Sequence, residues 1–254
     1  MLAAPVMFTV DVETDWEGEE TRGIQEALPR LLALLQSYGA SATFFVVGRL
    51  TSLVRDQINP QGPHEVGSHS LTHALLTQLP WETVVTEVAE SKRLLEDAGY
   101  HVEGFRAPFF RSPTALPGFL ARAGYTYNAS YGAVYPRLTR SRANSPKRES
   151  PLSLPQVETD VLRDGVSPCS LTYLRLYHPF GLKLVSPHTT LFYCHLHEFI
   201  AGANGWQRLP GFLRRLHCRH SGPTAWAIVE QLCAQFGSRF TSCRQYLSTQ
   251  ALQT

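Results

Sequence analysis

The stretch SATFFVV (Ser41–Val47) is short, almost continuously apolar, and rich in β-branched and aromatic residues. A strand with this pattern is buried on both faces, which is typical of a parallel sheet covered by helices. The preceding run, GIQEALPRLLALLQSYGA (residues 23–40), places apolar residues at helical spacing and has Gly39 as a stop signal. Pro29 inside this run indicates either an internal kink or a later helix start. The two segments predict a helix that leads into a buried parallel strand.

Strands and helices continue to alternate along the chain. The predicted strands cover residues 7–12, 41–47, 102–108, 154–160 and 189–199, and the predicted helices cover residues 23–40, 80–99, 112–124 and 224–237. This order predicts an α/β fold of parallel strands joined by helical crossovers. We expect residues 1–254 to form a single domain, because parallel barrels of this length are often undivided.

Composition excludes several classes of protein. The net charge of +2 is too small to predict nucleic-acid binding. No run approaches the roughly 18 apolar residues of a membrane helix, so no transmembrane segment is expected. The opening MLAAPVMFTVDVE lacks a basic start and soon becomes acidic, which indicates a first strand rather than a signal peptide. Five cysteines without paired spacing favour a reduced, cytoplasmic setting.

Candidate metal ligands follow two of the predicted elements. Asp11 and Glu13 alternate along the first strand, so both side chains can leave one face at its carboxyl end. In HEVGSHSLTH, His69 and His73 stand four residues apart in a segment expected at the same end of the sheet. One carboxylate with two histidines can bind Zn²⁺, Co²⁺, Ni²⁺ or Fe²⁺. A lone His-x-x-x-His pair is also typical of a helix surface or cap.

Other polar residues lie at the ends of apolar strands. Arg106 in GFRAPFF needs a carboxylate partner, for which Asp11 is the natural candidate. His195 ends the very apolar run TLFYCH, where only a partner or a function explains a histidine. Glu158 and Asp160 end the strand predicted over residues 154–160. Together these strand ends predict one site.

Four motifs resemble one known family. TVDVETDW (residues 9–16), HEVGSHSLTH (64–73), FRAPFF (105–110) and FYCHLHEF (192–199) occur in the order of the motifs of polysaccharide deacetylases, the NodB-like carbohydrate esterases. The segment SPCSLTYLRLYHPFG (167–181) is similar to a subgroup whose first motif reads like VDVED. The resemblance implies a distorted (β/α) barrel with fewer than eight strands.

The resemblance also implies roles for individual residues. Asp11 matches the general base, Arg106 the residue that holds it, and His195 the general acid. The metal ligands implied are Glu13, His69 and His73. The substrate-binding residues implied are Pro108, Asp15 and Phe109, whose backbone N–H matches an oxyanion donor.

The sequence departs from the family pattern at two positions. The metal carboxylate is usually Asp, which leaves Glu13 and Asp15 as alternatives. The motif that usually supplies an Asp to orient the acid histidine has Asn128 instead.

The function implied is a metal-dependent hydrolase that removes N-acetyl groups from an amino sugar. Zn²⁺ is the expected cofactor, with Co²⁺ or Ni²⁺ as alternatives. The acetylated sugar could belong to a polysaccharide, a nucleotide sugar or a lipid-linked saccharide. A cyclic amide or ureide hydrolase of the same fold and a catalytically inactive sugar-binding module stay open, as does the oligomeric state.

A basic segment rich in Ser and Pro, RLTRSRANSPKRESP, spans residues 137–151. Its simplest interpretation is a solvated surface loop. If it borders the site, its cations, among them Arg140 and Arg142, would suit a phosphate-bearing sugar.

Overall fold

The computed structural model describes residues 4–15, 18–132, 156–159, 170–186, 189–202, 211 and 218–251. Its strands are β1 (Val6–Val12), β2 (Thr43–Val46), β3 (Glu65–Ser68), β4 (Gly104–Phe105), β5 (Tyr127–Gly132), β6 (Gln156–Thr159), β7 (Leu191–His195) and β8 (Phe240–Thr241). Its α-helices are α1 (Leu28–Ser37), α2 (Thr51–Val54), α3 (Trp81–Asp97), α4 (Leu116–Arg122), α6 (Leu171–Leu176), α8 (Pro223–Phe236) and α9 (Cys243–Ala251).

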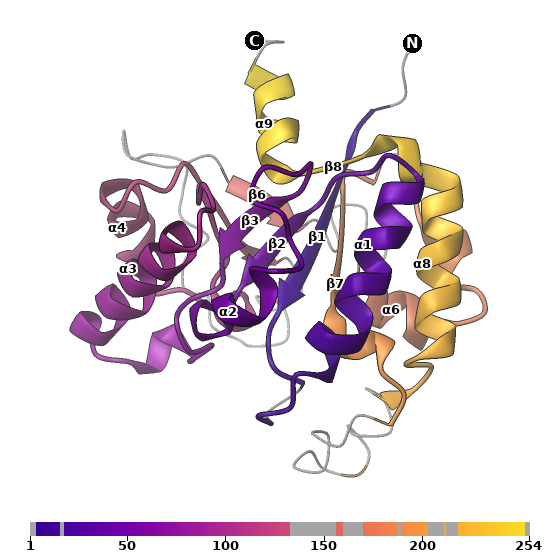
Figure 1. Ribbon diagram of the computed structural model, residues 1–254, viewed down its shortest axis with the longest axis horizontal. Helices are drawn as coiled ribbons and strands as arrows, with labels where there is room; N and C mark the ends of the chain where they lie inside the picture. The colour runs from indigo at the N-terminus through magenta and orange to yellow at the C-terminus, as the bar shows by residue number, and fades with distance from the viewer. Residues whose placement is uncertain are drawn as a thin grey trace.

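The described strands form one parallel sheet in the order β6-β5-β4-β3-β2-β1-β7. The two-residue β8 pairs with β1 beside this path. Helices lie around the outside of the sheet, with α3 and α4 towards one edge and α1 and α8 side by side towards the other (Figure 1). Seven strands on the continuous path are one fewer than a full eight-stranded barrel has. The predicted distorted (β/α) barrel is confirmed.

Alternation along β1 separates two faces of the sheet. Phe8, Val10 and Val12 are buried in the large core shared with the helices. Met7 belongs to a smaller apolar cluster, which contains Tyr127 from β5 and Leu191 from β7. Because side chains alternate along a strand, Thr9 and Asp11 share the face of Met7. This face is apolar at the start of β1 and becomes polar towards its carboxyl end.

Helix α9 packs at the opposite, amino end of the strands. The Cys243 N–H donates to Thr43 Oγ1 at 2.8 Å, and the Arg244 N–H donates to Glu65 Oε2 at 3.0 Å. Thr43 and Glu65 begin β2 and β3, so the helix covers the start of these strands. The carboxyl ends of these strands lie at the other end of the sheet, away from α9.

The structure corrects several predicted elements. β3 and β5 were not predicted as strands, because their buried polar residues hide the apolar pattern of a strand. The strand predicted over residues 189–199 ends at His195, and Leu196–Phe199 forms a 3-10 turn. Pro29 lies in the first turn of α1, where no N–H is needed, directly after a π-helical segment at Gly23–Ala27. The helical run already begins before Pro29, so the irregularity expected at Pro29 takes the form of this π-helical segment rather than of a later helix start.

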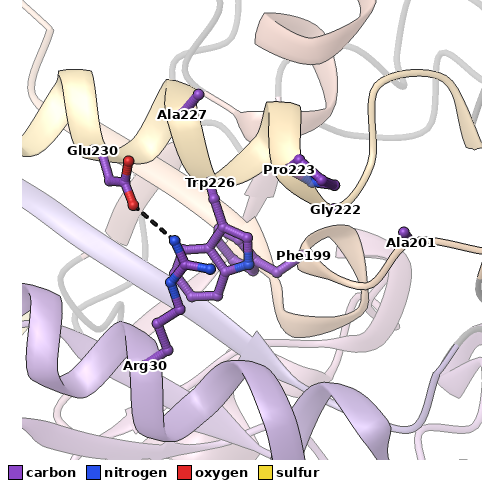
Figure 2. A pocket seen from close by; sticks show the side chains of 8 residues that line it. All are labelled: Arg30, Phe199, Ala201, Gly222, Pro223, Trp226, Ala227 and Glu230. Carbon is purple, nitrogen blue, oxygen red and sulfur yellow. Dashed lines mark hydrogen bonds and ion pairs between the residues drawn. The ribbon is translucent and has the colours of Figure 1, made fainter.

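The outer layer holds a pocket of about 350 Å³ between α1 and α8 (Figure 2). The Arg30 guanidinium lies 4.0 Å from the centroid of the Trp226 ring and 2.9 Å from a Glu230 oxygen. The lining residues are Arg30, Phe199, Ala201, Gly222, Pro223, Trp226, Ala227 and Glu230.

Over the described part of the chain, no helix is both long and apolar enough to cross a membrane.

Candidate active site

The carboxyl ends of four strands bring the predicted polar residues together. Asp11 lies in β1, opposite His195 at the end of β7 in the strand register. His69 directly follows β3, and Arg106 directly follows β4. Glu13 follows β1. The expected convergence at one end of the sheet is confirmed.

Glu13, His69 and His73 form the one group of possible metal ligands found among the described residues. Their ligand atoms lie within 4.8 Å of one another. His73 Nε2 is 2.6 Å from Glu13 Oε2, and His69 Nε2 is 4.0 Å from the same oxygen. One carboxylate and two imidazoles form a donor set that suits Zn²⁺ and similar cations.

A backbone carbonyl orients His69. Its Nδ1 lies 2.8 Å from the Arg106 carbonyl oxygen, which can only accept a hydrogen bond. Nδ1 therefore carries the hydrogen, and the Nε2 lone pair faces Glu13. Burial, with the nearby His73, outweighs the carboxylates and lowers the pKa of His69 to about 4. The ring is neutral at neutral pH, as a metal ligand must be.

His73 lies in a loop, so the alternative of a helix surface does not apply. Its backbone has a positive φ of 64°, and its N–H donates to Ser70 Oγ at 3.1 Å. Buried Glu87 on α3 accepts hydrogen bonds from the N–H groups of Leu71 and Thr72, each at 2.9 Å, and from the Thr72 hydroxyl at 2.6 Å. The loop that presents His73 is thus fastened to α3.

The first histidine of the quoted stretch lies elsewhere. His64 directly precedes β3, at the amino end of the sheet, and its ring packs edge-on against Phe44 with centroids 5.4 Å apart. Burial lowers the pKa of His64. It is a packing residue and is not part of the ligand group.

The predicted pair between Asp11 and Arg106 is confirmed. Arg106 Nη1 donates to Asp11 Oδ1 at 2.5 Å, and Nη2 donates to Thr9 Oγ1 at 3.1 Å. Burial alone would raise the pKa of Asp11, but Arg106, His69 and His195 lower it below its usual value. The other oxygen, Oδ2, lies 3.9 Å from His69 Nε2 and 3.8 Å from His195 Nε2. Asp11 is therefore an ionised carboxylate with one oxygen held and one facing the imidazoles.

His195 is held by Glu198, a residue that sequence reasoning did not identify. Glu198 Oε2 lies 3.3 Å from His195 Nδ1 and accepts the His195 backbone N–H at 2.9 Å. Burial would lower the pKa of His195, but the hydrogen bond to Glu198 and the charges of Glu13, Glu198 and Asp11 raise it to about 9. The ring is cationic at neutral pH.

His197 is a second site residue to which the sequence assigned no role. It is buried, its Nδ1 lies 3.5 Å from Glu13 Oε1, and its ring stacks on His195 with centroids 5.0 Å apart. Burial and His195 lower the pKa of His197 to about 4. The His-x-His spacing in FYCHLHEF was the available signal.

Asp15, the alternative metal carboxylate, is engaged in a turn. Its two oxygens lie 3.0 and 3.3 Å from the Gly23 N–H, and its carbonyl accepts from the Gly18 N–H at 3.2 Å. A Cβ on Gly23 would lie 2.8 Å from the Asp15 carboxylate, so glycine permits this approach. The substrate-binding role predicted for Asp15 stays a prediction.

The remaining predicted residues lie at the edge of the site or outside the described chain. Phe109 is 42% exposed, has a positive φ of 57°, and its ring centroid lies 5.0 Å from that of His73. Pro108 beside it is buried. The basic segment 137–151 and Asp160 lie outside the described residues, and the Glu158 side chain is likewise undescribed.

Comparisons with known proteins agree with this geometry. The family model for polysaccharide deacetylases matches residues 4–128, so this part of the chain is similar to that family. No curated protein matches the sequence. The VDVED-like subgroup stays a prediction.

Solved structures share the fold over nearly the whole chain. A Mycobacterium smegmatis protein assigned to the polysaccharide deacetylases is 18% identical, with a TM-score of 0.63, over 100% of this chain and 96% of its own. A peptidoglycan N-acetylglucosamine deacetylase is 16% identical, with a TM-score of 0.54, over 96% and 88% of the two chains. A CE4 family pseudoenzyme from Bacillus anthracis is 13% identical, with a TM-score of 0.55, over 96% and 66%. At these identities the likeness shows the fold alone.

Proposed function

We propose that this protein is a metal-dependent hydrolase that removes N-acetyl groups from an amino sugar. The observation that carries the proposal is the grouping of Glu13, His69 and His73 beside an ionised Asp11. The match of residues 4–128 to the polysaccharide deacetylase family model also supports the proposal. The sugar could belong to a polysaccharide, a nucleotide sugar or a lipid-linked saccharide.

Glu13, His69 and His73 would hold the cation. The lowered pKa values of Glu13 and His69 leave an anionic carboxylate and a neutral imidazole, the forms that bind metals. Zn²⁺ is the proposed ion, with Co²⁺ or Ni²⁺ as alternatives. When bound there, a divalent cation supplies Lewis-acid polarisation of the amide carbonyl.

Asp11 and His195 would move the protons. Asp11, held through Oδ1 by Arg106, accepts a proton at Oδ2 from the water that attacks the acetamide carbon. His195 carries a proton at neutral pH and donates it from Nε2 to the amine nitrogen as the C–N bond breaks. The products are acetate and a free amino sugar. The Phe109 N–H is proposed to stabilise the oxyanion, a contribution of about 3 kcal/mol for one donor.

The test is acetate release from three classes of N-acetylated substrate: a polymer, a nucleotide sugar and a lipid-linked sugar. We expect one class to release acetate, activity to vanish after exhaustive chelation, and Zn²⁺ or Co²⁺ to restore it. Full activity of the chelated protein would overturn the metal-dependent mechanism.

The same assay separates the alternatives. Ring opening of a cyclic amide or ureide without acetate release would favour the second hydrolase reaction. Sugar binding without either reaction would favour an inactive binding module, a state represented among the structural neighbours by the Bacillus anthracis pseudoenzyme.

A cytoplasmic location is also proposed. The cysteine pattern supports it, since Cys194, Cys233 and Cys243 are free, buried thiols. Fractionation of the native host, with an antibody against this protein, would test the location.

A further inference from the structure

One carboxylate oxygen of Glu198 contacts two atoms of His195. Its Oε2 accepts the His195 backbone N–H at 2.9 Å and lies 3.3 Å from His195 Nδ1. Glu198 is 1% exposed, so little solvent competes for this carboxylate. The carboxylate fixes the ring nitrogen that faces away from the site, while Nε2 lies 3.8 Å from Asp11 Oδ2.

The other oxygen of Glu198 is held from α6. Oε1 accepts from Arg175 Nε at 3.1 Å, from Arg175 Nη2 at 2.9 Å and from the Thr172 hydroxyl at 2.8 Å. Arg175 is also 1% exposed, and its Nη1 donates to the Arg219 carbonyl at 2.9 Å. A buried carboxylate with this set of donors keeps both its charge and its orientation.

Asn128, where the resemblance led us to expect the orienting carboxylate, is engaged elsewhere. Its Oδ1 accepts from the Ser130 N–H at 3.1 Å and from the Ser130 hydroxyl at 2.5 Å. Ser130 Oγ in turn accepts the Ala107 N–H at 2.8 Å. Asn128 thus supports the segment after Arg106, and no contact between Asn128 and His195 is found among the described residues.

We infer that Glu198, fixed by Arg175 and Thr172, is the positioning residue for His195 in this protein and takes the place of the absent carboxylate at Asn128. The catalytic consequence rests on the proposed function, whereas the positioning does not. Glu198 holds Nδ1–H and stabilises the imidazolium, so that the second ring proton sits on Nε2. The charged and titratable groups around His195 are Glu198 and His197 from the turn after β7, Tyr193 from β7, Asp11 from β1, Glu13 directly after β1, and Arg175 from α6 behind Glu198.

The test compares the titration of His195 in the 254-residue protein and in its variants. Zn²⁺ is supplied in every sample. Histidine ¹⁵N signals are followed by NMR against pH, and the His195 signal is assigned by its loss in His195→Asn. Glu198→Gln keeps the size of the side chain and removes its charge. We therefore expect the midpoint of the His195 titration to fall by about one pH unit or more. Thr172→Val, which keeps the carboxylate, is the matched control and should shift the midpoint far less.

Glu198→Gln leaves the buried Arg175 charge without its carboxylate and could prevent folding. Glu198→Gln with Arg175→Met removes both charges together and gives the same expected shift. An unchanged His195 midpoint in either folded variant would overturn the inference. This readout needs no turnover, so failure of the proposed activity is seen separately, as absence of acetate release from the wild-type protein.

If the protein is the proposed deacetylase, Glu198→Gln should lower kcat on the order of 10²-fold with little change in KM. The basic limb of its pH profile should move to lower pH, because the acid loses its proton earlier. A purely structural role would lower the amount of active protein but leave the pH profile in place, and that result would also count against the inference.

Discussion

Two pairs of histidines lie at the carboxyl end of the sheet, and the structure holds them in different ways. The rings of His69 and His73 are 4.9 Å apart, and those of His195 and His197 are 5.0 Å apart. His69 directs its Nδ1 to the uncharged carbonyl of Arg106, whereas His195 directs its Nδ1 to the carboxylate of Glu198. Burial lowers the pKa of His69 to about 4, but Glu198 and other carboxylates overcome burial and raise that of His195 to about 9.

This difference shows what the partner of Nδ1, the ring nitrogen that faces away from the site, does to a buried histidine. A neutral acceptor fixes the ring but does not stabilise its charge, so His69 keeps a lone pair for a cation. A carboxylate fixes the ring and stabilises the imidazolium, so His195 keeps a proton to donate. In the proposed function, one residue type would thus supply metal ligands on one side of Asp11 and a proton donor on the other.

The largest effect on metal binding and turnover is expected for a change in the proposed metal ligands. Glu13→Gln removes the charge of the carboxylate, so we expect bound metal to fall from about one ion per chain to almost none. Acetate release should fall about 10³-fold or more, as several kcal/mol of electrostatic stabilisation is lost. Metal content by elemental analysis and turnover are measured together.

Asp15→Asn is the matched control, because Asp15 bonds to the Gly23 N–H rather than to the histidines. This variant should keep its metal. If Asp15→Asn empties the site and Glu13→Gln does not, Asp15 is the ligand and the assignment of Glu13 is wrong.

A change at His195, the proposed general acid, should affect turnover without affecting metal content. His195→Asn should retain metal but lose kcat by about 10²–10⁴-fold, since the leaving amine is no longer protonated. Rates are measured with metal content determined on the same samples. Loss of metal in step with activity would make His195 a ligand and would remove the distinction between the two pairs. His197→Asn, which leaves both His195 and Glu198 in place, is the comparison variant.

A smaller effect on metal affinity is expected for Glu87, which fastens the loop that presents His73. Glu87→Gln replaces an acceptor of three hydrogen bonds from Leu71 and Thr72 by an amide that can accept through only one of its two polar atoms. We expect metal affinity to fall about 10- to 100-fold, measured by competition with a chromophoric chelator. Glu90→Gln, at an exposed position of the same helix, should leave the affinity unchanged. Equal affinities for both variants would exclude a role of Glu87 in presenting His73.

The smallest effect is on stability against pH. The pKa of His195 is raised from its ordinary value of 6.5 to about 9, so its contribution is fully present below pH 6.5 and is lost as pH rises through about 9. Over this range we expect the stability advantage of metal-free wild type over His195→Asn to shrink by about 1–2 kcal/mol. The value is modest because the His195 side chain is 18% exposed. Urea unfolding at several pH values measures it, and an advantage that grows with pH would contradict the assignment.

The side chains of the proposed site were easier to predict than the groups that hold them. Asp11, Glu13 and His195 could be placed together because alternation along a strand and the parallel order bring strand ends to one edge. The segment before His69 was not predicted as a strand, since Glu65 and Ser68 are polar residues buried inside the sheet. Their burial depends on partners from β2, α3 and α9, which no local pattern shows.

The sequence by itself determined the alternation of most strands and helices, the chemistry of the candidate ligand set and the need of Arg106 for a carboxylate partner, because periodicity and side-chain charge are properties of short segments. Only the tertiary structure decided which carboxylate faces the histidines and which one closes the turn at Gly23. It also decided that Glu198 rather than residue 128 supports His195, and that Glu87 supports the loop of His73. These choices depend on hydrogen bonds between residues of separate elements, and such bonds form where burial and distance allow, which spacing along the chain does not specify.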